Sequence, residues 1–182
     1  MPKIACVLLC IVLVFPLHAW NSETSQLRRF VGQWKGNYRV ETLTGREIGS
    51  FRIERSYYWQ NGHLMGATAL ELPDGTRQFE FSEIWHDVTV LRSIVESETK
   101  RMEYFGWMQH GSIWWQSHFD AETTFHQLHI EQLRPTHRGF QLALHGYRWT
   151  AFSNQPGFLR IHGELHRIES GEAFEFLQMM PE

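Results

Sequence analysis

Apolar and polar residues alternate along this chain in short runs that turn residues separate, from Trp34 nearly to Met180. Successive side chains of a β-strand point to opposite faces of a sheet, so this period of two is typical of half-buried strands. In the first run, Trp34–Thr42, the residues Trp34, Tyr38 and Val40 alternate with polar ones. No stretch of comparable length has the period of an amphipathic helix. The pattern predicts an all-β protein.

Turn signals divide the chain into about ten or eleven predicted strands with mostly short connections. Asn61-Gly62 predicts a tight hairpin, because both central positions of such a turn favour positive φ. Short connections make neighbouring strands antiparallel, and an open sheet of this width tends to curl or split. The sequence therefore predicts a single antiparallel up-and-down β-barrel of about ten strands, with a short helical turn within Ser22–Phe30. The other turn signals are Pro73-Asp74-Gly75, His86-Asp87, His110-Gly111, Pro135 to Gly139, Asn154 to Gly157 and Ser170-Gly171.

The start of the chain has the pattern of a secretory signal peptide. Lys3 supplies a positive charge, Ile4 to Leu17 form an apolar run, and Ala19 is a small residue at the expected cleavage point. The run is shorter than the roughly 20 residues that span a bilayer, which makes an uncleaved anchor the weaker interpretation. We expect residues 1–19 to be removed and residues 20–182 to form one β-barrel domain without a transmembrane span.

The amino-acid composition indicates where the protein is located and which kinds of partner it can bind. Both cysteines, Cys6 and Cys10, lie in the predicted signal peptide, so disulfides cannot stabilise the mature chain. Disulfides are common in secreted eukaryotic domains, so their absence favours a bacterial protein that is periplasmic or secreted. Removing Lys3 leaves 16 basic against 20 acidic residues, a formal charge of −4. Nucleic acid is not a predicted partner, because phosphate binding needs a basic surface. The sequence indicates no oligomeric state.

The segment Gly32-Gln33-Trp34-Lys35-Gly36, at the entry to the first predicted strand, resembles the Gly-x-Trp opening of lipocalins and related calycin barrels. The chain is thus similar to a lipocalin-like or fatty-acid-binding-like family of exported bacterial proteins. In lipocalins this Trp commonly stacks against an Arg from the last part of the barrel and closes one end. The resemblance implies that role for Trp34 with Arg160 or Arg167, and a place beside them for Gly32 and Gly36.

A second resemblance raises haem as an alternative ligand. The wider Gly-x-Trp-x-Gly form is also similar to nitrobindin-type haem barrels, although Tyr38 stands where that pattern has a further glycine. His162, beside Ile161 and Gly163, is the histidine that best fits an axial position. No metal-ion site is predicted, because His162 and His166 share a strand face but lie about 13 Å apart. Apart from this haem alternative, no cofactor is predicted.

Three predicted strands carry a charged residue on an otherwise apolar face. A buried charge costs several kcal/mol unless it is paired, so each needs a partner or a ligand. In a ligand-binding interpretation an arginine meets an acidic group and the aromatic rings surround an apolar body. In a structural interpretation the charged residues satisfy one another, or a bulge turns one outward. The candidate ligand-binding residues are Arg55, Tyr57 and Trp59 on one strand, Glu83 and Trp85 on another, and Arg148 on the third.

No catalytic motif accompanies these residues. The sequence has no Gly-x-Ser-x-Gly elbow, no phosphate-binding Gly-rich loop and no His-Glu-x-x-His site. Acid–base chemistry by Glu83 with a histidine stays open, because catalytic pairs on barrels assemble in space rather than in sequence. The leading hypothesis is an exported barrel that binds or carries a small apolar or amphipathic molecule, and the sequence leans away from an enzyme. The alternatives are a structural or protein-interaction barrel of the cell envelope, and a haem-binding or catalytic barrel.

Overall fold

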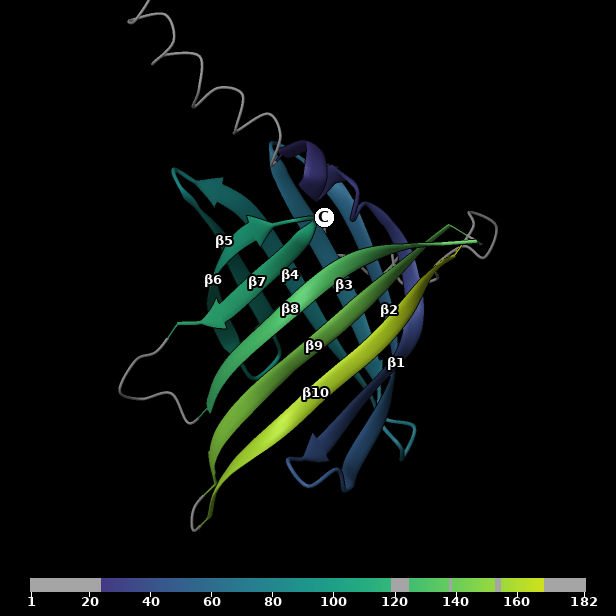
Figure 1. Ribbon diagram of the computed structural model, residues 1–182, viewed down its shortest axis with the longest axis vertical. Helices are drawn as coiled ribbons and strands as arrows, with labels where there is room; N and C mark the ends of the chain where they lie inside the picture. The colour runs from purple at the N-terminus through teal and green to yellow at the C-terminus, as the bar shows by residue number, and fades with distance from the viewer. Residues whose placement is uncertain (1–23, 119–124, 138, 153–154, 169–182) are drawn as a thin grey trace, which may run out of the picture.

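The computed structural model describes residues 24–118, 125–137, 139–152 and 155–168. They form ten strands, each paired antiparallel with the next, and β1 pairs with β10 to close a barrel (Figure 1). A short helix at residues 24–28 precedes β1. The predicted up-and-down barrel is confirmed. The strands are β1 (Gly32–Thr42), β2 (Glu47–Gln60), β3 (His63–Glu71), β4 (Arg77–Asp87), β5 (Val90–Ser97), β6 (Arg101–Gln109), β7 (Ser112–Ser117), β8 (Phe125–Thr136), β9 (Gly139–Phe152) and β10 (Gln155–Ile168).

Some sequence predictions lie outside the described residues. These are the signal peptide at residues 1–19, the first part of the predicted helical turn and the turn signal at Ser170-Gly171. Within the described ranges, no helix has the length and apolar character that crossing a membrane requires.

Tight turns set the register of the barrel strands. Asn61-Gly62 joins β2 to β3 with φ angles of 51° and 87°, which confirms the predicted hairpin. His110-Gly111 joins β6 to β7 in the same way, with φ angles of 51° and 75°. Because side chains alternate between the two faces of a strand, this register decides which residues reach the interior.

Apolar side chains close the barrel end that lies under the helix. Leu27, Phe30 and Trp34 are almost fully buried there, and we call these three residues the plug. The indole Nε1 of Trp34 donates a hydrogen bond to the carbonyl oxygen of Phe30 at 2.8 Å. The ring of Phe30 meets that of Tyr57 edge to face, with centroids 6.5 Å apart. The plug is thus a compact apolar core whose indole N–H is hydrogen-bonded.

An arginine from the last strand covers the plug. The Arg167 guanidinium carbon lies 5.1 Å from the centroid of the Trp34 ring. The same side chain donates hydrogen bonds to the carbonyl oxygens of Arg29 and Val31. Arg160 instead lies on the outer face of β10, next to the inward-facing Ile161. Of the two arginines that the lipocalin resemblance leaves open, Arg167 is the one over the tryptophan.

The two glycines of the Gly-x-Trp-x-Gly segment let β1 approach its neighbours. A Cβ atom at Gly36 would collide with the carbonyl oxygen of Glu164 in β10. Gly32 has a φ of 138°, and a Cβ atom there would meet the Arg167 side chain. Both positions therefore require glycine for the closed end to form.

Candidate functional site

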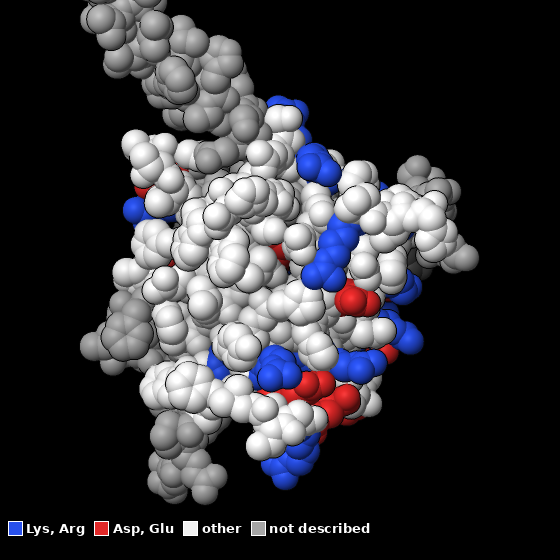
Figure 2. Space-filling view, viewed as in Figure 1, with Lys and Arg blue, Asp and Glu red and all other residues white. Residues whose placement is uncertain are grey.

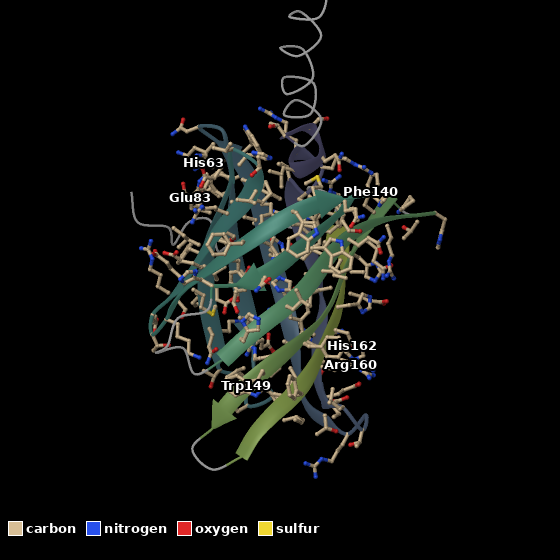
Figure 3. The ribbon with its side chains drawn as sticks, turned by 60° about the vertical axis from the view of Figure 1, so that its left-hand side comes forward. His63, Glu83, Phe140, Trp149, Arg160 and His162 are labelled. Carbon is tan, nitrogen blue, oxygen red and sulfur yellow. The ribbon has the colours of Figure 1, made fainter. Side chains whose placement is uncertain are left out.

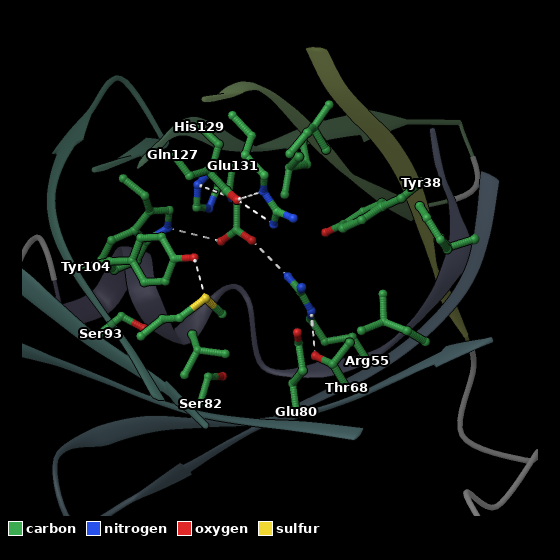
Figure 4. A pocket seen from close by; sticks show the side chains of 18 of the residues that line it. Tyr38, Arg55, Thr68, Glu80, Ser82, Ser93, Tyr104, Gln127, His129 and Glu131 are labelled. Carbon is green, nitrogen blue, oxygen red and sulfur yellow. Dashed lines mark hydrogen bonds and ion pairs between the residues drawn. The ribbon is translucent and has the colours of Figure 1, made fainter. Parts of the chain in front are cut away.

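A cavity of about 250 Å³ occupies the barrel interior beyond the plug. Figure 4 shows its side chains converging from several strands. Its lining is mixed, because hydroxyl, amide and charged groups face the same space as aliphatic side chains. The polar lining residues include Tyr38, Arg55, Tyr57, Thr68, Glu80, Ser82, Ser93, Tyr104, Gln127, His129, Glu131 and Arg148.

Some of the apolar lining residues lie at the end of the cavity away from the plug. Val40 is three inward positions beyond Trp34 along β1, and Phe51 of β2 lies opposite Tyr38, one inward position before Val40. Leu70 and Leu72 extend this wall into the turn that joins β3 to β4. The cavity is therefore polar in its middle layer and more apolar toward the end opposite the helix.

A buried ion pair crosses the middle of the cavity. Arg55 Nη1 in β2 lies 2.8 Å from Glu131 Oε1 in β8, a strand that is not adjacent to β2. Their side chains are only 11% and 5% exposed. Arg55 also donates from Nε to Thr68 Oγ1 at 3.0 Å and from Nη1 to Tyr57 Oη at 3.2 Å. Trp115 Nε1 donates to the second oxygen of Glu131 at 3.3 Å. Both charges are therefore paired and further hydrogen-bonded, as burial demands.

A second polar chain runs along β8 and β9. Arg148 donates from Nε and Nη2 to Gln127 Oε1 at 3.0 and 2.8 Å. The Gln127 amide nitrogen lies 3.0 Å from His129 Nδ1. Burial lowers the pKa of His129 to about 4, so its ring is neutral near pH 7 and Nδ1 accepts this hydrogen bond.

Three tyrosines in the cavity wall keep their protons at neutral pH. Burial raises the pKa of Tyr38 and of Tyr104 to about 12, and it raises the pKa of Tyr57 further. Each is consequently a hydroxyl donor in the cavity. Tyr104 donates to the sulfur of Met102 at 3.7 Å. The buried Tyr38 hydroxyl has no hydrogen-bond partner among the residues that the structure describes.

The structure brings together three of the six candidate ligand-binding residues. Arg55, Tyr57 and Arg148 line the cavity. Trp59 also faces inward, but it lies at the plug end, where the Arg28 guanidinium carbon is 4.5 Å from its ring centroid. Arg55 pairs with Glu131 rather than with the predicted partners Glu83 or Arg148.

The prediction that Glu83 and Trp85 face the cavity is wrong. Both lie on the outer face of β4, where Glu83 Oε1 is 2.5 Å from His63 Nδ1 (Figure 3). Trp85 stacks on the His63 ring with centroids 5.7 Å apart. The side chains that β4 sends inward are instead Gln78, Glu80, Ser82 and Ile84.

The reversed pattern of β4 has a physical explanation. On the outer face, Phe79 and Phe81 lie opposite Ala69 and Ala67 of β3 in the strand register. These alanines are buried although they face outward, because larger side chains cover them. At this level the inward side chains of β4 face a polar cavity, and its apolar side chains cover the alanines on the outer face. The rule that apolar residues point inward fails at this strand.

The histidine that the haem alternative requires, His162, does not face the barrel interior. His162 lies on the outer face of β10, where Nε2 is 3.0 Å from Glu41 Oε1 (Figure 3). It lines a surface groove of about 360 Å³ together with Arg160 and Tyr147. His162 is therefore no axial ligand for a group inside the barrel. In the described part of the chain, no three histidine or carboxylate side chains are grouped to hold a metal ion.

The sequence interpretation missed several cavity residues. Gln127, His129 and Glu131 are successive inward positions of β8 and supply most of the hydrogen-bonding partners in the cavity. Their alternation with Leu128 and Ile130 was a usable signal, since it places three polar residues on one strand face. Glu80 was missed because the wrong face of β4 was assigned to the interior.

Comparisons with known proteins show the fold and no sequence family. No family model matches the chain, and no curated protein matches it in sequence. Among solved structures, the barrel is similar to an S-type phycobiliprotein lyase, CPES, from Guillardia theta, with a TM-score of 0.59. The identity is 8%, and the match covers 80% of this chain and 92% of that one. At this identity the likeness shows a shared β-barrel fold.

Proposed function

We propose that this barrel binds a small amphipathic molecule in its interior cavity. The observation that carries the proposal is the buried network around Arg55 and Glu131, placed beside an unfilled space of about 250 Å³. A barrel that needed only a core would be more stable with apolar side chains there, because burying an ion pair often costs more than it returns. Ligand sites, by contrast, combine apolar walls with a few polar groups that orient the ligand.

The lining determines the orientation of the ligand. Its polar end lies in the middle layer near Arg55, and its apolar part lies toward Val40 and Leu72. The cavity is slightly smaller than the roughly 300 Å³ at the low end of drug-sized sites, so the ligand is small. An acidic group, which the sequence suggested for Arg55 or Arg148, would also face the carboxylates of Glu80 and Glu131.

Export is part of the proposal. The positive start, short apolar run and small residue in residues 1–19 support a cleaved signal peptide and a periplasmic or secreted protein. A ligand-binding protein of this kind needs no catalytic motif, which agrees with the sequence.

A protein-interaction role is the second candidate, because one outer face of the barrel is apolar. Trp107 and Trp114 stack there with centroids 6.1 Å apart, and Leu128 and Tyr147 are exposed. Figure 2 shows few charged side chains over β7 and β8 on this face. Exposed apolar patches of this kind mark interaction sites in many proteins.

Native mass spectrometry of protein purified from its own cell envelope tests both parts of the proposal. We expect a mass that corresponds to a chain beginning near Trp20, and a small additional mass that disappears after denaturation. A chain that retains Met1 to Ala19 would overturn export. A chain of the unliganded mass that binds no member of an alcohol, acid and amine panel would overturn the carrier function, and a defined complex with another protein would then favour the interaction role.

A further inference from the structure

The hydroxyl group of Tyr38 lacks a hydrogen-bond partner although it is buried. Tyr38 faces inward from β1, and Figure 4 shows its hydroxyl pointing toward the centre of the cavity. No described residue meets the geometry of a hydrogen bond to it, and the nearby Arg55 guanidinium acts on it by charge, which opposes the rise of the Tyr38 pKa that burial causes. Leaving such a buried group unsatisfied is unfavourable. A bound molecule that accepts a hydrogen bond from Tyr38 would remove this cost.

Glu80 is a half-buried carboxylate that faces the same cavity. It faces inward from β4 opposite Thr68, and Figure 4 shows it pointing into the cavity from another wall. The structure records neither a hydrogen bond nor an ion pair between Glu80 and another described residue. Glu131, by contrast, receives hydrogen bonds from Arg55 and Trp115. Glu80 is therefore an available acceptor in the cavity.

Charges of the cavity lining already balance. Two guanidinium groups, Arg55 and Arg148, face two carboxylates, Glu80 and Glu131. His129 and the tyrosines are neutral near pH 7, because burial disfavours their charged forms. A ligand with a full charge of either sign would be desolvated in a cavity that offers it no net counter-charge, which is costly.

We infer that the polar end of the ligand is a neutral hydroxyl group, which accepts a hydrogen bond from Tyr38 and donates one to Glu80. A hydroxyl has one donor and two acceptor sites, so it matches this arrangement, whereas a carboxylate has no proton to give and an ammonium group has no acceptor. This inference rests on the proposed function and names its ligand class as short- or medium-chain alcohols. The aliphatic chain extends toward Val40 and Leu72.

Binding of three ligands with the same chain tests this inference. The purified protein is titrated at pH 7 with 1-octanol, octanoate and octylamine, and the fluorescence of Trp115, which lines the cavity, is a convenient readout alongside calorimetry. We expect 1-octanol to bind at least about tenfold more tightly than the other two. Tighter binding of octanoate or octylamine would overturn the hydroxyl assignment and leave the carrier function standing. If none of the three binds and no passenger is found in native protein, the carrier function and this inference fail together.

Two variants and a matched control locate the hydroxyl group. Tyr38→Phe removes only the hydroxyl that has no partner within the protein, so it should fold normally and lose about five- to tenfold in affinity for 1-octanol. Glu80→Gln should weaken 1-octanol less and should improve octanoate relative to it, because it removes a negative charge. Tyr147→Phe is the control, because that tyrosine is exposed on the outer face of the barrel, and its affinity should stay within about twofold. Unchanged 1-octanol affinity in Tyr38→Phe would overturn the inference.

Discussion

Two layers of the same barrel interior follow opposite rules. At the helix end, Leu27, Phe30 and Trp34 form an apolar plug in which the indole N–H is hydrogen-bonded. Next to this plug, Arg55, which lies opposite Trp34 in the register of β1 and β2, forms a buried ion pair with Glu131 beside an unfilled space. The plug comes from the helix, the turn after it and the start of β1, whereas the ion pair joins β2 to β8. The two layers therefore differ in side-chain chemistry and in the part of the chain that supplies them.

The contrast assigns separate roles to the two layers. Apolar burial contributes about 25 cal/mol for each Å² removed from water, so the plug stabilises the closed barrel. The ion pair contributes little net stability, because desolvation offsets the attraction between its charges. We therefore expect the plug to maintain the fold, and under the proposed function the ion pair and the polar residues around it hold the ligand.

The largest expected effect is at the plug. Trp34→Ala should lower the free energy of unfolding by about 3–5 kcal/mol, because it removes a fully buried indole that the surrounding strands cannot replace. Denaturant melts provide the measurement. Trp107→Ala, at an exposed position on the outer face, is the matched control and should cost far less. A loss below about 1 kcal/mol for Trp34→Ala would mean that the plug is not the main core.

The polar residues of the cavity should instead make the stability of the protein depend on pH. Burial holds the pKa of His129 at about 4 in the folded protein, below the usual 6.5, so the unfolded chain binds a proton more readily than the folded one between these values. Stability is therefore lost as the pH falls from 6.5 toward 4, and His129 accounts for about 2–3 kcal/mol of that loss at pH 4.5. His129→Gln should flatten the decline of unfolding free energy between pH 7 and pH 4.5. An identical pH dependence in the two proteins would show that His129 is not buried in its neutral form.

Much of the fold was predictable from local sequence. Alternation from Trp34 onward and the Asn61-Gly62 turn predicted antiparallel strands and their closure into a barrel. The choice between Arg160 and Arg167 was not predictable, because it depends on the register between β1 and β10. That register places Arg167, rather than Arg160, at the level of Trp34.

The candidate site was predicted less well than the fold. Arg55 and Arg148 were found because each is a charge on an otherwise apolar face, a signal that survives in the structure. Glu83 was misplaced because the face of β4 that looks apolar in sequence is the outer one. The partner of Arg55, Glu131, lies 76 residues away on a non-adjacent strand, and no local pattern specifies such a pairing. Inward faces are recognised in a sequence because they are usually apolar, and this rule fails where the interior is a polar cavity.

The division between plug and polar layer is tested most directly by the free energy of unfolding of the double variant Arg55→Met/Glu131→Leu, measured without ligand. Glu131→Leu alone should cost about 3–5 kcal/mol, because it leaves the Arg55 guanidinium buried without its carboxylate. The double variant removes both charges together. We predict that its free energy of unfolding equals or exceeds that of the natural sequence. A loss of several kcal/mol in the double variant would contradict the account, because the ion pair would then be part of what holds the barrel together.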